Sequence, residues 1–418
     1  MDKNILKQLN KAQKASTEFA LLPHARKILI LKNLSKELLR NKKEIITANS
    51  KDLKKLSIND PMRDRLLLTA ERVESMAREV GNVARLKDPI GGIFDQRVRH
   101  GLKIFRQRVP IGVVGVIYES RPNVTTDVAA ICIKSGNVAV LKGGKEARES
   151  YIALHKVIQR ALKVSGISPE VVQFIDPNIK DGALSLVTAE GLIDLIIPRG
   201  SSNLINFVRK NATVPVIETG AGVCHTFVDE SARLDPSGRV VFNAKTQRPS
   251  VCNSLDTLLV HTRIASKFLP IVGNLLAKKK VEIFGDQKSF AILKNFYPSI
   301  LLRKAKEEDF GREFLSQKMS IKVVSGIDEA LEHIKKYSSK HSEAILTENK
   351  ANKEKFLREV DAAVVYDNAS TRFSDGAMFG LGAEIGISTS KLHARGPMGP
   401  EELTTYKWVV MGKYTTRK

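Results

Sequence analysis

One cysteine of this chain lies in a setting suited to nucleophilic chemistry. Cys252 lies in a polar segment, 242–254, that contains Gln, Arg, Pro, Asn and Ser and is expected to be irregular, just before a strand-like run at 255–261. Lys245 and Arg248 precede it and would favour the thiolate. A buried, inert thiol is the usual alternative. Because such polar neighbours are poor core material, the pattern predicts that Cys252 is a nucleophile.

The other two cysteines are expected to be structural. Cys132 lies in an apolar stretch with helical spacing, which is typical of a protein core. Cys224 opens a predicted strand and remains the alternative nucleophile. The chain has no Cys-x-x-Cys pair and no regularly spaced histidines, which argues against a disulfide framework and a structural zinc site. No metal is expected.

The composition favours a large, basic, globular protein. With 418 residues the chain is long enough for two lobes. The net charge is +23, but lysine and arginine are spread along amphipathic stretches, and aromatic residues make up only 6%. This pattern is typical of a solvated basic surface that can steer anionic ligands, and it disfavours nucleic-acid binding. No membrane-length apolar run or signal-type N-terminus is seen, so we expect a soluble, cytosolic protein without a membrane partner.

The predicted elements form two alternating strand and helix series. The first ~90 residues have a helical pattern, a break follows at 87–92, and a hairpin at 98–109 turns near His100 and Gly101. Short apolar runs with helical stretches between them then predict parallel strands in two doubly wound lobes. The predicted strands of the first lobe are 111–118, 137–142, 171–175, 192–197 and 214–217. Those of the second lobe are 255–260, 321–324, 343–347 and 362–366.

Two glycine-containing turns could bind phosphate, although the G-x-G-x-x-G fingerprint of a conventional dinucleotide-binding fold is missing. Residues 142–145 (KGGK) leave one predicted strand, and residues 198–203 (PRGSSN) leave another. Either turn alone is an ordinary connection between a strand and a helix. Since both follow the carboxyl ends of strands in one lobe, where α/β sheets bind ligands, their co-occurrence favours a nucleotide site.

Several longer motifs resemble a known family over essentially the whole chain. Residues 110–125, 217–222, the Cys252 segment, 379–389 and 393–398 are similar to the gamma-glutamyl phosphate reductase family of the aldehyde dehydrogenase superfamily. The resemblance implies an aldehyde dehydrogenase-like α/β fold with two doubly wound lobes and a small oligomerisation flap. It also implies a cofactor lobe at 1–227 with the hairpin 97–109 in the flap, a catalytic lobe at 228–370, and a return to the cofactor lobe with an oligomerisation segment at 371–418.

The same resemblance implies a reaction and the residues that carry it. The reaction is the NADPH-dependent reduction of L-glutamyl 5-phosphate to L-glutamate 5-semialdehyde with release of phosphate, in proline biosynthesis. Cys252 would form a thioester, and Asn123 with the Cys252 backbone N–H would stabilise the oxyanion. From its position alone, Asn123 could equally be a helix N-cap. The substrate-binding candidates are Arg121, Asn253 and Arg395.

The cofactor-binding residues also follow from the resemblance. Lys142, with Gly143, matches the lysine that binds the adenine ribose. Lys145 stands where many NAD-using relatives have a glutamate, which favours NADP. Gly200 and Ser201 match the turn at the cofactor pyrophosphate.

The resemblance also bears on two glutamates and on the assembly of the protein. Glu313 matches the acidic residue that holds the nicotinamide ribose, and Glu218 matches the base of hydrolytic relatives, so its role here stays open. The resemblance implies a homo-oligomer, and an association with glutamate 5-kinase is possible. The alternatives are a coenzyme A-acylating aldehyde dehydrogenase of the same fold and a basic nucleic-acid-binding protein.

Overall fold

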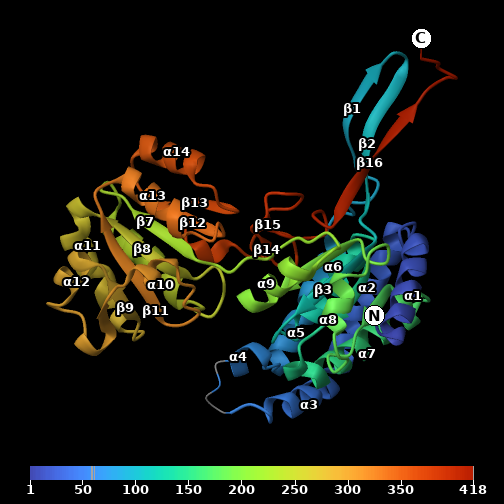
Figure 1. Cartoon of the computed structure of the whole chain (residues 1–418), viewed down its shortest axis with the longest axis horizontal. Coiled ribbons are helices and arrows are strands. Elements are labelled where there is room, and N and C mark those ends of the chain that lie inside the picture. The colour runs from blue at the N-terminus through green and yellow to red at the C-terminus, as the bar shows by residue number, and fades with distance from the viewer. Residues whose placement is uncertain (58–59, 61, 418) are drawn as a thin grey trace. The chain divides into compact units, whose positions relative to one another are not determined.

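The chain forms two compact units. A computed structural model describes residues 1–57, 60 and 62–417. Unit 1 comprises residues 1–219, 379–386 and 392–418, and unit 2 comprises 220–378 and 387–391 (Figure 1). The domain limits expected from the sequence, after residues 227 and 370, lie near these unit limits and stay a prediction.

Unit 1 begins with amphipathic helices, as expected for the first ~90 residues. Leu31, Leu34 and Leu38 recur at helical spacing and are all fully buried in the core of unit 1. Asp2 caps the first helix by accepting the N–H groups of Asn4 and Ile5. The helices are α1 (Lys3–Phe19), α2 (His24–Arg40), α3 (Lys42–Leu53), α4 (Met62–Leu66) and α5 (Ala70–Arg85).

A parallel sheet of four strands in the order β5-β4-β3-β6 forms the centre of unit 1. Its strands are β3 (Val113–Tyr118), β4 (Val138–Lys142), β5 (Val172–Phe174) and β6 (Leu195–Arg199). Its helices are α6 (Val124–Lys134), α7 (Arg148–Val164), α8 (Gly182–Val187) and α9 (Ser202–Asn211). The strand expected at 214–217 is wrong, because this segment makes only an isolated bridge between Val216 and Ile196. Pro215 has no N–H to donate to a ladder.

Unit 2 contains a parallel sheet of seven strands in the order β10-β9-β11-β8-β7-β12-β13. Successive residues of β8 face opposite sides: Leu258 and Val260 belong to one hydrophobic cluster and Leu259 to another. The first cluster includes side chains of α10 and α11, and the second includes side chains of α13 and α14. Helices therefore cover both faces of the sheet, and the expectation of a doubly wound lobe is confirmed (Figure 1).

Unit 2 contains two strands that were not predicted, β9 and β10, whereas the strand expected to open at Cys224 is confirmed as β7. The strands are β7 (Cys224–Val228), β8 (Leu255–His261), β9 (Glu282–Gly285), β10 (Leu302–Lys304), β11 (Lys318–Val324), β12 (Ser342–Leu346) and β13 (Val364–Asp367). The helices are α10 (Leu234–Thr246), α11 (Thr262–Ala277), α12 (Gln287–Leu293), α13 (Ile327–Tyr337) and α14 (Lys350–Glu359).

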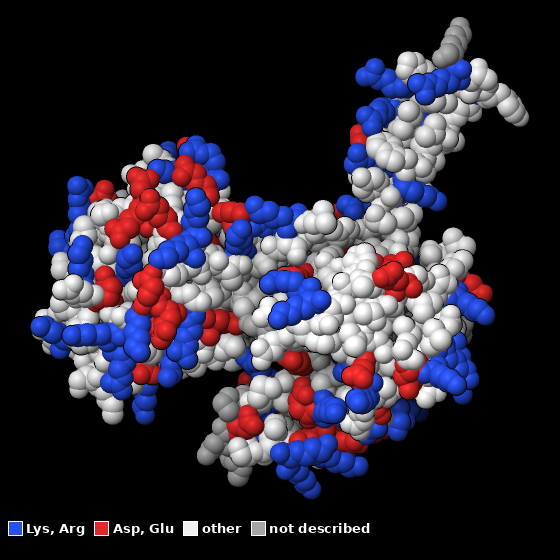
Figure 2. Space-filling view, viewed as in Figure 1, with Lys and Arg blue, Asp and Glu red and all other residues white. Residues whose placement is uncertain are grey.

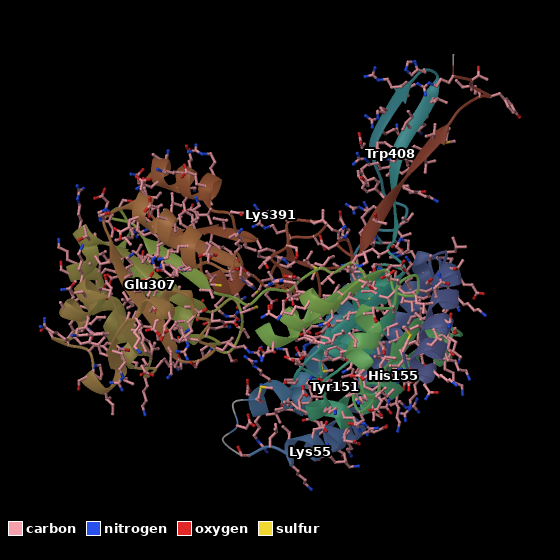
Figure 3. All side chains as sticks on the ribbon, in the orientation of Figure 1. Lys55, Tyr151, His155, Glu307, Lys391 and Trp408 are labelled. Atoms are coloured by element: carbon pink, nitrogen blue, oxygen red, sulfur yellow. The ribbon has the colours of Figure 1, made fainter. Side chains whose placement is uncertain are left out.

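A separate antiparallel sheet of three strands, here called the arm, belongs to unit 1. It consists of β1 (Ile93–Arg99), β2 (Leu102–Pro110) and β16 (Thr404–Met411). His100 and Gly101 turn the hairpin with positive φ angles of 50° and 74°, which matches the twist of the strands. The hairpin is therefore confirmed, and β16 pairs with β2 and not with the main sheet. Trp408 lies on this arm (Figure 3) with Arg106 over its ring.

Charge is distributed over both units. Figure 2 shows lysine and arginine side chains interspersed with acidic ones on the visible faces of the two units, whereas the charged side chains of the arm are mostly lysine and arginine. This pattern fits a solvated basic surface better than a single basic patch. Within the described part of the chain, no helix is long and apolar enough to cross a membrane.

Candidate active site

Cys252 lies in a short loop between a helix and a strand of unit 2. Helix α10 continues to Thr246, so the irregular segment is shorter than expected from the sequence and covers only 247–254. The helix extends this far because Val241 and Ala244 face the core of the unit. Pro249 then restricts the backbone, and β8 begins at Leu255. Cys252 is partly exposed at this junction.

The residue after Cys252 anchors the loop to a distant segment. The Asn253 side-chain amide donates to the backbone carbonyls of Ser374 at 2.8 Å and Arg372 at 3.4 Å. In return, the Thr371 hydroxyl donates to the Asn253 carbonyl at 2.8 Å. Asn253 is buried, and its amide nitrogen is used to hold the loop. We therefore read Asn253 as a residue that fixes the backbone at Cys252, although its expected contact with substrate stays a prediction.

Cys224 is buried behind the Cys252 loop at the start of β7. Its thiol donates to the Cys252 carbonyl at 3.2 Å. Burial, followed by the nearby Glu343 carboxylate, raises the pKa of Cys224 well above its usual range. Cys132 is also fully buried, in α6, and burial raises its pKa as well. Neither of these thiols has the setting of a nucleophile, whereas Cys252 does.

A close backbone approach fixes the other side of the Cys252 loop. A Cβ atom at Gly222 would lie only 1.6 Å from the Cys252 carbonyl oxygen, so no side chain fits at this position. The Gly222 N–H donates to the Glu313 carboxylate at 2.8 Å. Glu313, the candidate for the nicotinamide ribose, is thus held next to the segment that packs on Cys252.

The expected role of Lys245 beside the thiolate is wrong. Lys245 is fully buried, its ammonium donates to the Leu255 carbonyl at 2.8 Å, and it lies 3.6 Å from the Asp256 carboxylate. Burial raises the pKa of Asp256 to about 6, against the opposing effect of Lys245, and burial lowers the pKa of Lys245. Helical spacing points Lys245 into the core, where it joins the end of α10 to the start of β8. Arg248 remains exposed in the loop.

Arg372 is a residue near Cys252 that the sequence reasoning missed. Its Nε donates to the Gln247 side-chain oxygen at 2.7 Å, and Gln247 lies in the same loop as Cys252. It comes from the short 3₁₀ turn η5 (Thr371–Phe373). Arg372 lies far from Cys252 along the chain, and only the fold brings the two segments together. The sequence alone therefore contains no signal for this residue.

Unit 1 brings three of the predicted loops to one edge of its sheet. In the parallel register, Ile117 at the end of β3 aligns with Lys142 of β4 and with Pro198 of β6. The loops that follow these strands therefore start side by side at the carboxyl edge. They contain the candidate residues Arg121, Asn123, Lys142, Gly143, Lys145, Gly200 and Ser201.

Asn123 occupies the N-cap position of α6 but does not cap it with its side chain. Its amide nitrogen donates instead to the Asp127 carboxylate at 2.9 Å, one helical turn ahead. Burial raises the pKa of Asp127 well above its usual range, and the bond from Asn123 opposes this rise. The side-chain capping alternative is thus wrong, and the oxyanion role of Asn123 stays a prediction.

The turn after β4 presents two lysines with different burial. Lys142 is half-buried, and burial is the main cause that lowers its pKa, while Lys145 is exposed. Packing requires glycine at position 143, because a Cβ atom there would lie 2.2 Å from the Tyr151 ring. Arg148 is engaged elsewhere, with its guanidinium held by both carboxylate oxygens of Asp176.

The turn after β6 already binds an anion of the protein itself. The Ser201 N–H, at the start of α9, donates to the Glu119 carboxylate at 2.7 Å. A Cβ atom at Gly200 would lie 2.4 Å from the same carboxylate. A helix N-terminus that holds a carboxylate has the donors that a phosphate group requires. The residues at this turn therefore fit the pyrophosphate of a dinucleotide.

Two further candidate residues also lie in unit 1. Glu218 makes a two-point ion pair with Arg209, at 2.9 and 2.5 Å. Arg395 is half-buried in the C-terminal part of the unit. No group of three or more His, Cys, Asp or Glu residues in the described ranges could hold a metal ion.

The chain matches known proteins over its length. The aldehyde dehydrogenase family profile matches residues 2–289. A gamma-glutamyl phosphate reductase of Pelodictyon phaeoclathratiforme is 51% identical over 100% of both chains, and one of Legionella pneumophila is 50% identical over 99% of both. The crystal structure of gamma-glutamyl phosphate reductase from Thermotoga maritima matches with a TM-score of 0.93 and 46% identity, covering 99% of this chain and 100% of that one.

More distant structures share the fold. An NADP complex of a glyceraldehyde-3-phosphate dehydrogenase from Methanocaldococcus jannaschii is 18% identical, with a TM-score of 0.73 over 98% of this chain and 94% of that one. These matches confirm the aldehyde dehydrogenase-like fold expected from the sequence. With a family profile that covers more than half of its residues and relatives that match from end to end, this chain belongs to the aldehyde dehydrogenase family.

Proposed function

We propose that this protein reduces L-glutamyl 5-phosphate to L-glutamate 5-semialdehyde with NADPH and releases phosphate, a step of proline biosynthesis. The observation that carries the proposal is the setting of Cys252. It is the partly exposed one of the three cysteines, and Asn253 and Gly222 fix the loop around it. The full-length likeness to gamma-glutamyl phosphate reductases supports the same acyl phosphate chemistry.

The chemistry of Cys252 follows from its thiolate. The sulfur attacks the 5-carbonyl carbon, the carbon–oxygen bond to phosphate breaks, and phosphate leaves with the electron pair. The resulting thioester accepts hydride more readily than a carboxylate does. The reduced thiohemiacetal then expels the thiolate and gives the aldehyde, so Cys252 is recovered. The backbone N–H of Cys252 and the Asn123 amide are our candidates for stabilising the oxyanion.

Most of the candidate cofactor residues belong to unit 1. Bound NADPH would supply the hydride. Gly200 and Ser201 would bind its pyrophosphate at the start of α9, after Glu119 has left this position. Lys142 would hold the adenine ribose, and the exposed Lys145 would pair with the 2′-phosphate. Glu313 of unit 2 would accept from the nicotinamide ribose.

The proposed function differs from that of hydrolytic family members in the molecule that accepts the acyl group from the thioester. In the oxidative direction, phosphate should attack the thioester, whereas hydrolytic relatives use water and a glutamate base. Both carboxylate oxygens of Glu218 accept hydrogen bonds from the Arg209 guanidinium. A water molecule would have to compete with the Arg209 guanidinium for both Glu218 oxygens, which favours phosphate as acceptor.

An oxidative assay tests the proposal directly. Glutamate semialdehyde, NADP and phosphate should give NADPH only when all three are present, and arsenate should replace phosphate. Steady NADPH formation without phosphate would instead indicate a hydrolytic aldehyde dehydrogenase. A requirement for coenzyme A would indicate the acylating alternative.

A further inference from the structure

The segment around Arg372 is joined to the Cys252 loop at two points. Its backbone carbonyl accepts from the Asn253 amide, and its Nε donates to the Gln247 side-chain oxygen at 2.7 Å. Asn253 directly follows Cys252, and Gln247 opens the loop. The Arg372 guanidinium is therefore held in place by the loop that presents the nucleophile. All of these residues belong to unit 2.

Two guanidinium groups and the thiol interact electrostatically at this loop. Burial lowers the pKa of Arg372, the charges of Asp375 and Cys252 act against this shift, and the charge of Arg248 adds to it. Arg248 directly follows Gln247, the residue that accepts from Arg372, so both arginines belong to the surroundings of the Cys252 loop. The Asp375 carboxylate is also used by the backbone N–H groups of Ala377 and Met378. Arg372 and Arg248 thus bring two positive charges to the loop that carries Cys252, and the Asp375 carboxylate opposes the lowered pKa of Arg372.

Repulsion between two arginines costs stability unless an anion occupies the space beside them. An acyl phosphate provides such an anion, because its phosphoryl group is bonded through one oxygen to the carbonyl carbon that the thiolate attacks. Guanidinium groups bind phosphoryl oxygens through paired N–H donors, which suits them to this position. The thiolate alone has a single charge and does not require two arginines.

We propose that Arg372 and Arg248 form the phosphoryl subsite of the enzyme. In the reductive direction they bind the phosphoryl group of the acyl phosphate and stabilise the departing phosphate. In the oxidative direction they bind the inorganic phosphate that attacks the thioester. Gln247 acts as a positioning residue that orients Arg372. The subsite rests on the proposed function, because both name phosphate as the leaving group.

The first test is the dependence of the oxidative reaction on phosphate. Loss of one charge-assisted contact should raise the KM for phosphate on the order of tenfold to a hundredfold in Arg372→Gln and in Arg248→Gln, with the KM for the aldehyde nearly unchanged. Gln247→Ala should give a smaller rise, since it loosens Arg372 without removing its charge. Arg358→Gln, on the exposed face of α14, removes one charge of unit 2 elsewhere and should leave both KM values unchanged.

The second test needs neither cofactor nor turnover. Inorganic phosphate should slow alkylation of Cys252 by iodoacetamide in the wild type and in Arg358→Gln, at constant ionic strength. The protection should be lost in Arg372→Gln and in Arg248→Gln. Because Arg248 is exposed, its variant should fold even if the Arg372 variant does not.

Each contrary outcome has a distinct meaning. An unchanged phosphate KM in both arginine variants, with protection retained, overturns the subsite. Slower alkylation of Arg372→Gln without phosphate, together with an unchanged phosphate KM, shows that Arg372 acts on the thiolate, and this also overturns it. If the wild type shows no phosphate-dependent turnover but phosphate still protects Cys252 through both arginines, the proposed function fails and the anion subsite stands.

Discussion

Three cysteines with the same functional group have different surroundings in this protein. Cys132 and Cys224 are enclosed by the cores of their units, where burial raises their pKa. Cys252 lies in a loop that neighbouring backbone groups fix from both sides. A fixed, partly exposed thiol can attack a carbonyl, whereas a buried thiol cannot reach one. The expected reactivity of each cysteine therefore depends on where the fold places it.

The close contact at Gly222 yields a sharp prediction. Gly222→Ala places a methyl group against the Cys252 carbonyl and should displace the nucleophile. Because a misplacement of about 1 Å can cost on the order of a hundredfold in rate, kcat should fall by about that factor while cofactor affinity stays. The control is Gly326→Ala, where the nearest atom is 3.9 Å away. Normal kcat in Gly222→Ala would contradict the packing described.

Cofactor selectivity is expected to depend on the turn after β4. Lys145→Glu should weaken NADP and improve NAD, because the carboxylate repels the 2′-phosphate and can accept from a free ribose hydroxyl. We expect about a tenfold change in the ratio of kcat/KM for the two cofactors. This is a small effect for a charge-assisted contact, because Lys145 is exposed and solvent and salt screen its charge. Lys142→Ala should weaken both cofactors. An unchanged ratio would place the 2′-phosphate away from Lys145.

At the scale of elements, the Cys252 loop is held at its base by α10 and β8. Lys245, near the end of the helix, and Asp256, in the strand, form a buried pair, and Asp256 also accepts the Phe314 N–H at 3.1 Å. Phe314 follows Glu313, so the same carboxylate helps to place the acidic residue that binds Gly222. The pair thus links the nucleophile's loop to a candidate cofactor ligand.

Breaking this pair should destabilise the catalytic unit. Asp256→Asn leaves the Lys245 ammonium buried without a charged partner, and the free energy of unfolding should drop by about 3–5 kcal/mol. The double variant Lys245→Met with Asp256→Asn should recover most of this loss, because no buried charge remains. Urea denaturation measures both. A single variant as stable as the wild type, or a double variant no better than the single one, would refute this view of the pair.

The elements could be predicted from local sequence, but the neighbours of the nucleophile could not. Apolar runs correctly placed most strands, because burial on both faces leaves a strong local signal. The run at 214–217 has the same composition yet makes one bridge, since pairing depends on a partner strand and on Pro215. Lys245 was misplaced because segment 242–254 was expected to be irregular, whereas α10 continues to Thr246 and buries Lys245. Arg372 was missed because only the fold brings it to Gln247.

At the scale of the whole molecule, the candidate residues are divided between two units. The candidates for the adenine ribose, 2′-phosphate and pyrophosphate lie in unit 1, and the candidate nucleophile Cys252 and the proposed phosphoryl subsite lie in unit 2. The arm of unit 1 has neither set of residues. Its exposed apolar side chains include Tyr406, Trp408, Val410 and Met411.

We expect these side chains to be covered in a homo-oligomer. Val410, which is 55% exposed, should lie in the interface, so Val410→Asp should reduce the sedimentation coefficient without unfolding the subunit. Leu21→Asp, at a position 82% exposed outside the arm, is the control. Sedimentation of Val410→Asp like the wild type would show that the arm does not mediate assembly. A possible association with glutamate 5-kinase stays a separate prediction.

The identity of the nucleophile is the central claim, and paired serine variants test it most directly. We would measure phosphate-dependent NADPH formation from glutamate semialdehyde in Cys252→Ser and Cys224→Ser. Cys252→Ser should lose turnover while keeping cofactor affinity, because a serine alkoxide is scarce at neutral pH and is a poor leaving group. Cys224→Ser should retain most activity. Turnover kept in Cys252→Ser and lost in Cys224→Ser would contradict the assignment of Cys252 and the thioester chemistry built on it.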